Sequence, residues 1–86
     1  MSYFGAIAFC VMVNGTTEKC PPPKVRREEY ATEEACQRGM AEYMPYHERG
    51  MQKQMEQAPV LMSDLKLSFK CLPAAEAAKL QRYPAS

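Results

Sequence analysis

The chain has 86 residues, a net charge of +1 from 11 Lys and Arg against 10 Asp and Glu, and a hydrophobic fraction of 47%. A chain of this length forms one domain with a modest core, so we expect a single domain over 1–86, with its core at about 3–72 and a tail at 73–86. The balanced charge argues against nucleic acid as a partner, and no apolar run approaches the roughly 20 residues of a membrane-spanning helix, so no membrane partner is expected either.

The first predicted element is the run YFGAIAFCVMV at Tyr3–Val13, which contains no charge and no proline. Read at the period of a strand, one face carries Tyr3, Gly5, Ile7, Phe9, Val11 and Val13, and the other carries Phe4, Ala6, Ala8, Cys10 and Met12. A strand with two apolar faces is typical of one that is covered on both sides. The Asn14-Gly15 pair behind it favours a strand that ends in a tight turn.

The segment from Thr16 to Cys20 can return beside this strand before Pro21, Pro22 and Pro23 end the pairing. A two-residue loop would pair Val13 with Thr16, whereas a three-residue loop would pair Val13 with Thr17 and set Cys10 opposite Cys20.

The charged segment KVRREEY at Lys24–Tyr30 is predicted to be an edge strand, because charged side chains on an edge discourage further pairing. Arg26 and Arg27 belong to the only basic cluster. They are candidate partner-binding residues, and a solvated edge is the alternative interpretation.

A helix is expected from the N-cap Thr32 to about Gln57, with Glu33 and Glu34 in its first turn. Its apolar stripe consists of Cys36, Met40, Tyr43, Met44, His47, Met51 and Met55. Pro45 lacks an amide proton and crowds the carbonyl of Ala41, which predicts a kink or break near Met44.

The segment from Asp64 to Leu72 alternates cleanly and predicts a half-buried strand, with Leu65, Leu67, Phe69 and Cys71 on one face and Lys66, Ser68 and Lys70 on the other. The tail after Pro73 is rich in alanine and predicts a short helix whose apolar side includes Leu80 and Tyr83. The expected fold is α+β: a three-stranded antiparallel sheet in ββαβ order, one kinked helix on one face, and a short C-terminal helix.

Four cysteines, Cys10, Cys20, Cys36 and Cys71, are spaced unlike a zinc ribbon or a thioredoxin-type pair, and three disulfide connectivities are open. If the helix crosses back over the sheet, Cys36 meets Cys71 and Cys10 is left with Cys20; buried free thiols are the alternative. The run at Tyr3–Val13 lacks the basic start and cleavage site of an export leader, which favours the cytoplasm, whereas two disulfides would favour a periplasmic or secreted location.

Met44, His47, Met51 and Met55 recur at helical spacing, and thioether and imidazole groups suit Cu(I). The alternative is ordinary core packing, since a helix must bury its apolar stripe and methionine fills irregular cores. The single histidine lies far from Cys36 along the helix, and no nucleophile motif or phosphate loop occurs, so we expect neither an enzyme nor a cofactor.

The cysteines lie in the patterns F-C at Phe9, Y-A-T-E-E-A-C at Tyr30–Cys36 and F-K-C-L-P at Phe69–Pro73, with Cys20 between the first two. This arrangement resembles short uncharacterised proteins common in proteobacterial and phage genomes. Most of those carry an export-like leader, whereas the run at Tyr3–Val13 lacks the basic start of such a leader. Size, α+β build and missing catalytic motifs are also similar to phage-encoded inhibitors of bacterial defence such as anti-CRISPR proteins.

The leading hypothesis is therefore a non-enzymatic interaction protein that occludes a protein partner or a second copy of itself, in the manner of a phage inhibitor of a defence system. Candidate contacts are Arg26, Arg27, Leu80 and Tyr83. A Cu(I) carrier and a small exported domain held by two disulfides are the alternatives.

Overall fold

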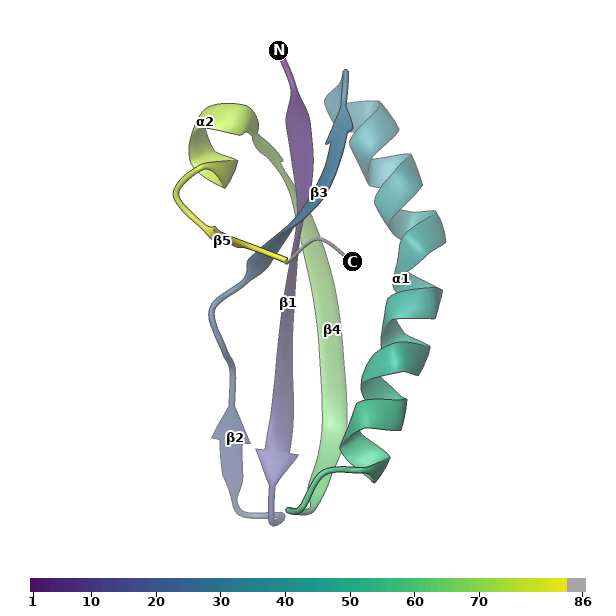
Figure 1. Ribbon diagram of the computed structural model, residues 1–86, viewed down its shortest axis with the longest axis vertical. Helices are drawn as coiled ribbons and strands as arrows, with labels where there is room; N and C mark the ends of the chain where they lie inside the picture. Colours follow the sequence, from purple (N-terminus) through teal and green to yellow (C-terminus); the bar gives the residue numbers. More distant parts are fainter. Residues whose placement is uncertain (84–86) are drawn as a thin grey trace.

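A computed structural model describes residues 1–83 of the chain (Figure 1). It is an α+β fold with five strands, one long helix and one short helix. In chain order the elements are β1 (Tyr3–Val13), β2 (Thr17–Lys19), β3 (Lys24–Tyr30), α1 (Glu33–Glu56), β4 (Met62–Pro73), α2 (Ala74–Ala77) and β5 (Gln81–Arg82).

Strand β1 is the centre of the sheet, as its two apolar faces predict. It pairs antiparallel with β4 along one edge, and with β2 and β3 along the other. The expectation of three antiparallel strands is wrong in two respects, because the return segment after the turn forms a strand of its own, β2, and because β5 pairs in parallel with β3. The first difference arises because β1 is eleven residues long and accepts two short neighbours on one edge, separated by the prolines at 21–23.

The β1–β2 hairpin has the three-residue loop that brings two cysteines together. Val13 pairs with Thr17, and Asn14 and Gly15 adopt positive φ angles of 54° and 70°. These left-handed conformations suit Asn and Gly. The register therefore places Cys10 beside Cys20, as the longer-loop alternative predicts.

Helix α1 covers one face of the sheet through its first half. The hydroxyl of Thr32 caps it by accepting a hydrogen bond from the Ala35 amide at 3.0 Å. Cys36 and Met40 pack with Ile7 into a cluster of buried residues. The helix runs unbroken through Pro45, so of the expected kink or break near Met44 the break is wrong, and the kink stays a prediction. Proline cannot donate the hydrogen bond that an amide would make to the Ala41 carbonyl, yet the helix continues on both sides of Pro45.

The tail covers the other face, but only at the start of β1. Ala77 of α2 is fully buried with Phe4, Ala6 and Val25, and Leu72 and Leu80 pack against them. Figure 1 shows α2 and α1 on opposite sides of β1. The helix expected after Pro73 is a single turn, because the chain leaves it at Ala78 to form β5; the last three residues of the predicted tail lie outside the described part.

Within residues 1–83, no helix combines the length and the apolar character needed to cross a membrane.

Candidate binding groove beside helix α1

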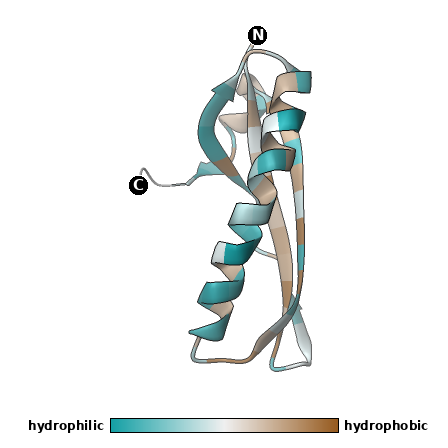
Figure 2. Ribbon diagram, turned by 90° about the vertical axis from the view of Figure 1, so that its right-hand side faces the viewer, coloured by the Kyte–Doolittle hydropathy of each residue, from teal (hydrophilic) through white to brown (hydrophobic). Residues whose placement is uncertain are grey.

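The second half of α1 lies less deeply against the sheet than the first. The only buried residues of the helix are Cys36 and Met40, and from Tyr43 onwards every residue is at least partly exposed. Figure 2 shows that hydrophilic residues dominate this half of the helix, whereas the strands beside it are largely hydrophobic. Apolar side chains on both sides of the seam between helix and sheet therefore remain partly uncovered.

Two adjoining hollows occupy this seam, and we call them together the methionine groove. The first has a volume of about 460 Å³ and lies between Ile7 and Phe9 of β1 and Tyr43, Tyr46, His47 and Met51 of α1. The second, of about 300 Å³, is lined by Phe9, Val11 and Val13 of β1 and by Met51, Met55 and Met62. Phe9, Pro21, Met51 and Gln54 line both hollows, so the groove is continuous along the seam.

His47 lines the first hollow of the groove, and aromatic side chains surround its ring. Its Nδ1 is 3.4 Å from the Tyr43 hydroxyl, and the Tyr83 ring packs edge-on against the imidazole with 5.7 Å between centroids. Burial, together with the nearby Arg26 guanidinium, lowers the pKa of His47 below 6.5. The Nε2 atom is covered and has no hydrogen-bond partner among the described residues. His47 is therefore a neutral, packed imidazole at pH 7.

Arg26, which is partly buried, and Arg27, which is exposed, both contact other elements of the chain. The Arg26 guanidinium lies 3.6 Å from the centroid of the Tyr43 ring and forms an ion pair with Glu28 at 3.3 Å. Arg27 donates a hydrogen bond of 2.9 Å to the Tyr83 carbonyl. These two predicted contact residues thus hold the helix and the tail to β3.

Leu80 and Tyr83 are also used within the fold, on opposite faces of the sheet. Leu80 packs against the cluster under α2, whereas Tyr83 packs with the cluster under α1. The Tyr83 amide donates to the Val25 carbonyl at 3.0 Å, which places its ring at the groove. Burial raises the pKa of Tyr83, so its phenol stays protonated.

The four predicted Cu(I) ligands do not share one cavity. His47 and Met51 line the first hollow, and Met51 and Met55 line the second. Met44 instead lines a hollow on the β4 side of the helix, with Leu67 and Phe69. A copper ion bound by His47 Nε2 would need the covering side chains to move, and the Cu(I) hypothesis stays a prediction.

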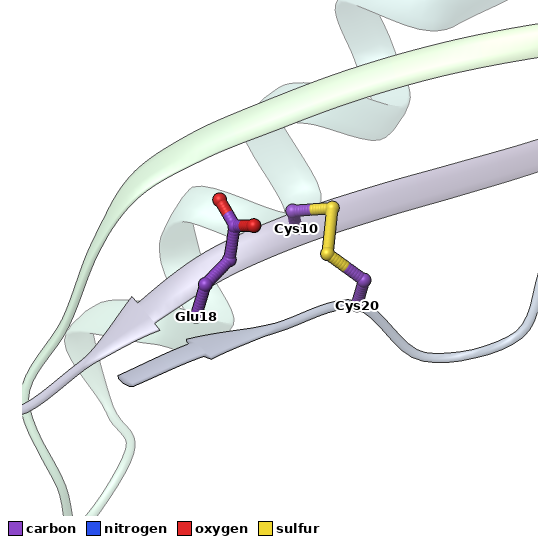
Figure 3. A group of neighbouring side chains, drawn as sticks. All are labelled: Cys10, Glu18 and Cys20. Atoms are coloured by element: carbon purple, nitrogen blue, oxygen red, sulfur yellow. A yellow bond between two sulfur atoms is a disulfide. The ribbon is translucent and has the colours of Figure 1, made fainter. Parts of the chain in front are cut away.

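The cysteines form the two expected pairs, Cys10 with Cys20 and Cys36 with Cys71, with Cα atoms 4.2 Å and 6.0 Å apart. Cys36 is fully buried, whereas Cys20 is exposed. The Glu18 side chain lies beside the Cys10–Cys20 bridge (Figure 3), and their ligand atoms fall within 4.8 Å of one another. The joined sulfurs are not thiolates, so this cluster is a disulfide with a neighbouring carboxylate.

Sequence reasoning missed the part of the groove that β1 and the loops supply. The sequence predicts Phe9 and Val13 only as strand residues, and it gives no role to Tyr46 or to Met62, which lies before the predicted strand at Asp64–Leu72. One feature of the sequence indicates this groove. A strand that is apolar over eleven residues needs cover along its whole length, but the apolar residues of the helix are most closely spaced near Met40 and Met44. The rest of the strand is therefore expected to have less cover.

No protein-family model, curated protein or solved structure matches this chain.

Proposed function

We propose that the protein is a non-enzymatic interaction domain that acts by steric occlusion of a protein partner, with the methionine groove as its contact surface. The occupant of the groove is an apolar segment of that partner. The protein acts in an oxidising compartment, where its two cysteine pairs are joined.

The observation that supports this proposal is the largely apolar lining of the groove, which polar side chains such as Lys24 and Gln54 interrupt. Phe9, Met51 and Met55 are each only partly buried, although they face one another across the seam. Extended apolar surface of this kind is uncommon on a protein that works alone, and it marks interfaces. Flexible thioethers adapt to the shape of a bound side chain, which suits a contact surface.

Exposed apolar residues continue the surface beyond the groove. Tyr46 at its rim is 67% exposed, and Leu61 in the loop below α1 is 65% exposed. The same loop contributes Val60 and Leu61 to a hollow that also contains Met55 and Met62. A partner that fills the groove therefore meets further apolar side chains at one end of the molecule.

The cysteine pairing bears on where such a partner is found. Disulfides persist in secreted and periplasmic proteins and are rare in the cytosol. This favours an extracytoplasmic partner over a cytosolic defence complex. The narrower hypothesis of a phage-type inhibitor of the anti-CRISPR class stays a prediction without support from the comparisons.

The test replaces Met51 and Met55 together by Glu, which keeps helix propensity and places two charges in the groove. Tagged wild-type protein and the M51E/M55E variant are incubated with periplasmic and secreted fractions of the host, and bound proteins are quantified by mass spectrometry. Lys79→Glu, an exposed change near α2, serves as the matched control.

The proposal expects a partner that the wild type and Lys79→Glu retain and that M51E/M55E loses, while all three proteins unfold at similar temperatures. Equal capture by the groove variant and the control, with the fold intact, would contradict it.

A further inference from the structure

Strand β4 has one edge that pairs with nothing in residues 1–83. It is twelve residues long and pairs only with β1. Along a free edge, alternate residues direct their backbone N–H and C=O groups outwards, where another extended chain can bind them. Figure 1 shows α1 running alongside β4.

Two hollows follow one another between this edge and α1, and we call them the β4 slot. One, of about 420 Å³, lies beside Gln37 and residues 69–72, and the other, of about 370 Å³, lies beside Ala41, Pro45 and residues 67–69. Each lining contains consecutive strand residues, whose side chains point to opposite faces. The strand's edge, and not one of its faces, therefore borders both hollows.

Pro45 gives the slot an acceptor that an ordinary helix lacks. It has no N–H, so the carbonyl of Ala41 loses its usual donor four residues on. Both residues are exposed and line the same hollow. The proline that the sequence predicts to break the helix instead leaves a carbonyl beside an unpaired strand edge.

The side chains of β4 define the chemistry of a matching strand. Lys66 and Lys70 are exposed on the face away from α1, and Leu67 and Phe69 on the helix side are only partly buried. Glu18 approaches Lys66 at 4.0 Å, while Lys70 makes no ion pair among the described residues. A strand with acidic residues opposite the two lysines and apolar residues between them complements both faces.

A second copy of the chain is the less suitable occupant. The antiparallel register that overlaps Leu65–Cys71 most fully places Lys66 of each copy opposite Lys70 of the other. Like charges directly opposite each other destabilise a pair of strands. The charges of β4 thus oppose self-pairing and favour an acidic strand.

From this geometry we infer that the β4 slot is a strand-addition site for an extended segment of another protein, with alternating acidic and apolar residues. Main-chain hydrogen bonds to the free edge supply affinity, and the two hollows and two lysines supply selectivity. This site lies on the opposite flank of α1 from the methionine groove and does not depend on the function proposed for that groove.

The test uses the capped peptide Val-Glu-Val-Thr-Val-Glu-Val, which reads the same in both directions and so permits either pairing direction. Binding to the oxidised full-length protein is followed by fluorescence anisotropy, and the site is located by amide hydrogen exchange. We expect protection of alternate amides of β4 and about tenfold weaker binding of the analogue with Lys in place of Glu. The K66E/K70E variant should reverse that preference.

An N-methylated peptide separates strand addition from simple charge attraction. It carries methyl groups on the amides of residues 2 to 6, which removes the N–H donors on both edges of the peptide, so neither pairing direction keeps them, while both Glu side chains remain. This peptide should lose binding if the main chain pairs with β4, and should keep it if charge alone attracts it.

Equal binding of the methylated and unmethylated peptides, protection outside β4, or a dimer that protects β4 without peptide would each overturn the inference. M51E/M55E should bind the peptide as the wild type does, so failure of the groove proposal is distinguishable from failure at the slot.

Discussion

The bridge between Cys36 and Cys71 should contribute more to stability than the bridge between Cys10 and Cys20. The first joins residues 35 positions apart and ties α1 to β4, and the second joins residues 10 positions apart within one hairpin. Closing a longer loop removes more entropy from the unfolded chain. The chain-entropy relation gives about 3.8 kcal/mol for the first bridge and about 2.7 kcal/mol for the second.

These magnitudes are large for so small a domain. A chain of this size is stable by roughly 4–13 kcal/mol, so loss of both bridges removes much or all of that free energy. Cys36 is also fully buried beside Ile7 and Met40, and Ala in its place leaves part of the sulfur's volume empty. The cost at this bridge should therefore exceed the entropy figure.

The assay is guanidinium unfolding of the wild type, C10A/C20A and C36A/C71A, with the free energy of unfolding obtained by linear extrapolation. Intact mass with and without reductant first establishes the bridges, since each disulfide removes two hydrogens. A larger loss in C10A/C20A than in C36A/C71A, or a loss below about 1 kcal/mol in both, would refute this account of the fold's stability.

Three further predictions concern residues at the helix–sheet seam. Folding lowers the pKa of His47 below 6.5, so the unfolded chain binds the proton more readily than the folded protein does. The free energy of unfolding should therefore fall as pH drops through 6.5, and it should level off below the pKa of the folded state. His47→Gln should flatten this part of the plot of urea midpoint against pH. A Cβ at Gly5 would overlap the Met40 side chain, so Gly5→Ala should cost about 1–3 kcal/mol, and additive costs in Gly5→Ala/Met40→Ala would argue against that contact. If Met51 and His47 bind Cu(I), titration under reducing conditions should show affinity better than micromolar that is lost in H47A/M51A; unchanged binding in that variant would exclude the site.

The parts of the fold that sequence predicts well are those fixed by local pattern. The period-two alternation from Leu65 to Cys71 matches the alternating exposure of β4, and Thr32 caps α1 as its side chain predicts. The apolar faces of Tyr3–Val13 also predict the central strand. In each case one short-range rule, either burial of alternate residues or satisfaction of a free amide, determines the local structure.

The parts that sequence predicts poorly depend on long-range contacts. Gln81 and Arg82 carry no strand pattern, and they form β5 only because Tyr83 bonds to the backbone of Val25 and packs near His47. Pro45 was a helix breaker by local rule, yet one missing hydrogen bond does not outweigh the packing and hydrogen bonds of a 24-residue helix. A local sequence pattern cannot predict this outcome, because the packing of the helix against the sheet depends on residues far away in the sequence.

The tail and helix α1 bury different parts of β1, and the parts that they leave exposed are the surfaces that a partner can reach. The tail buries Phe4 and Ala6 on one face, and the first half of α1 buries Ile7 on the other. Beyond these residues Val11 is the one further buried residue of β1, whereas Phe9 and Met12 are only partly buried. The stable core therefore lies at one end of the sheet, and the methionine groove lies towards the other. A change such as Met51→Glu should then affect binding far more than folding, whereas a change at Ile7 should affect both.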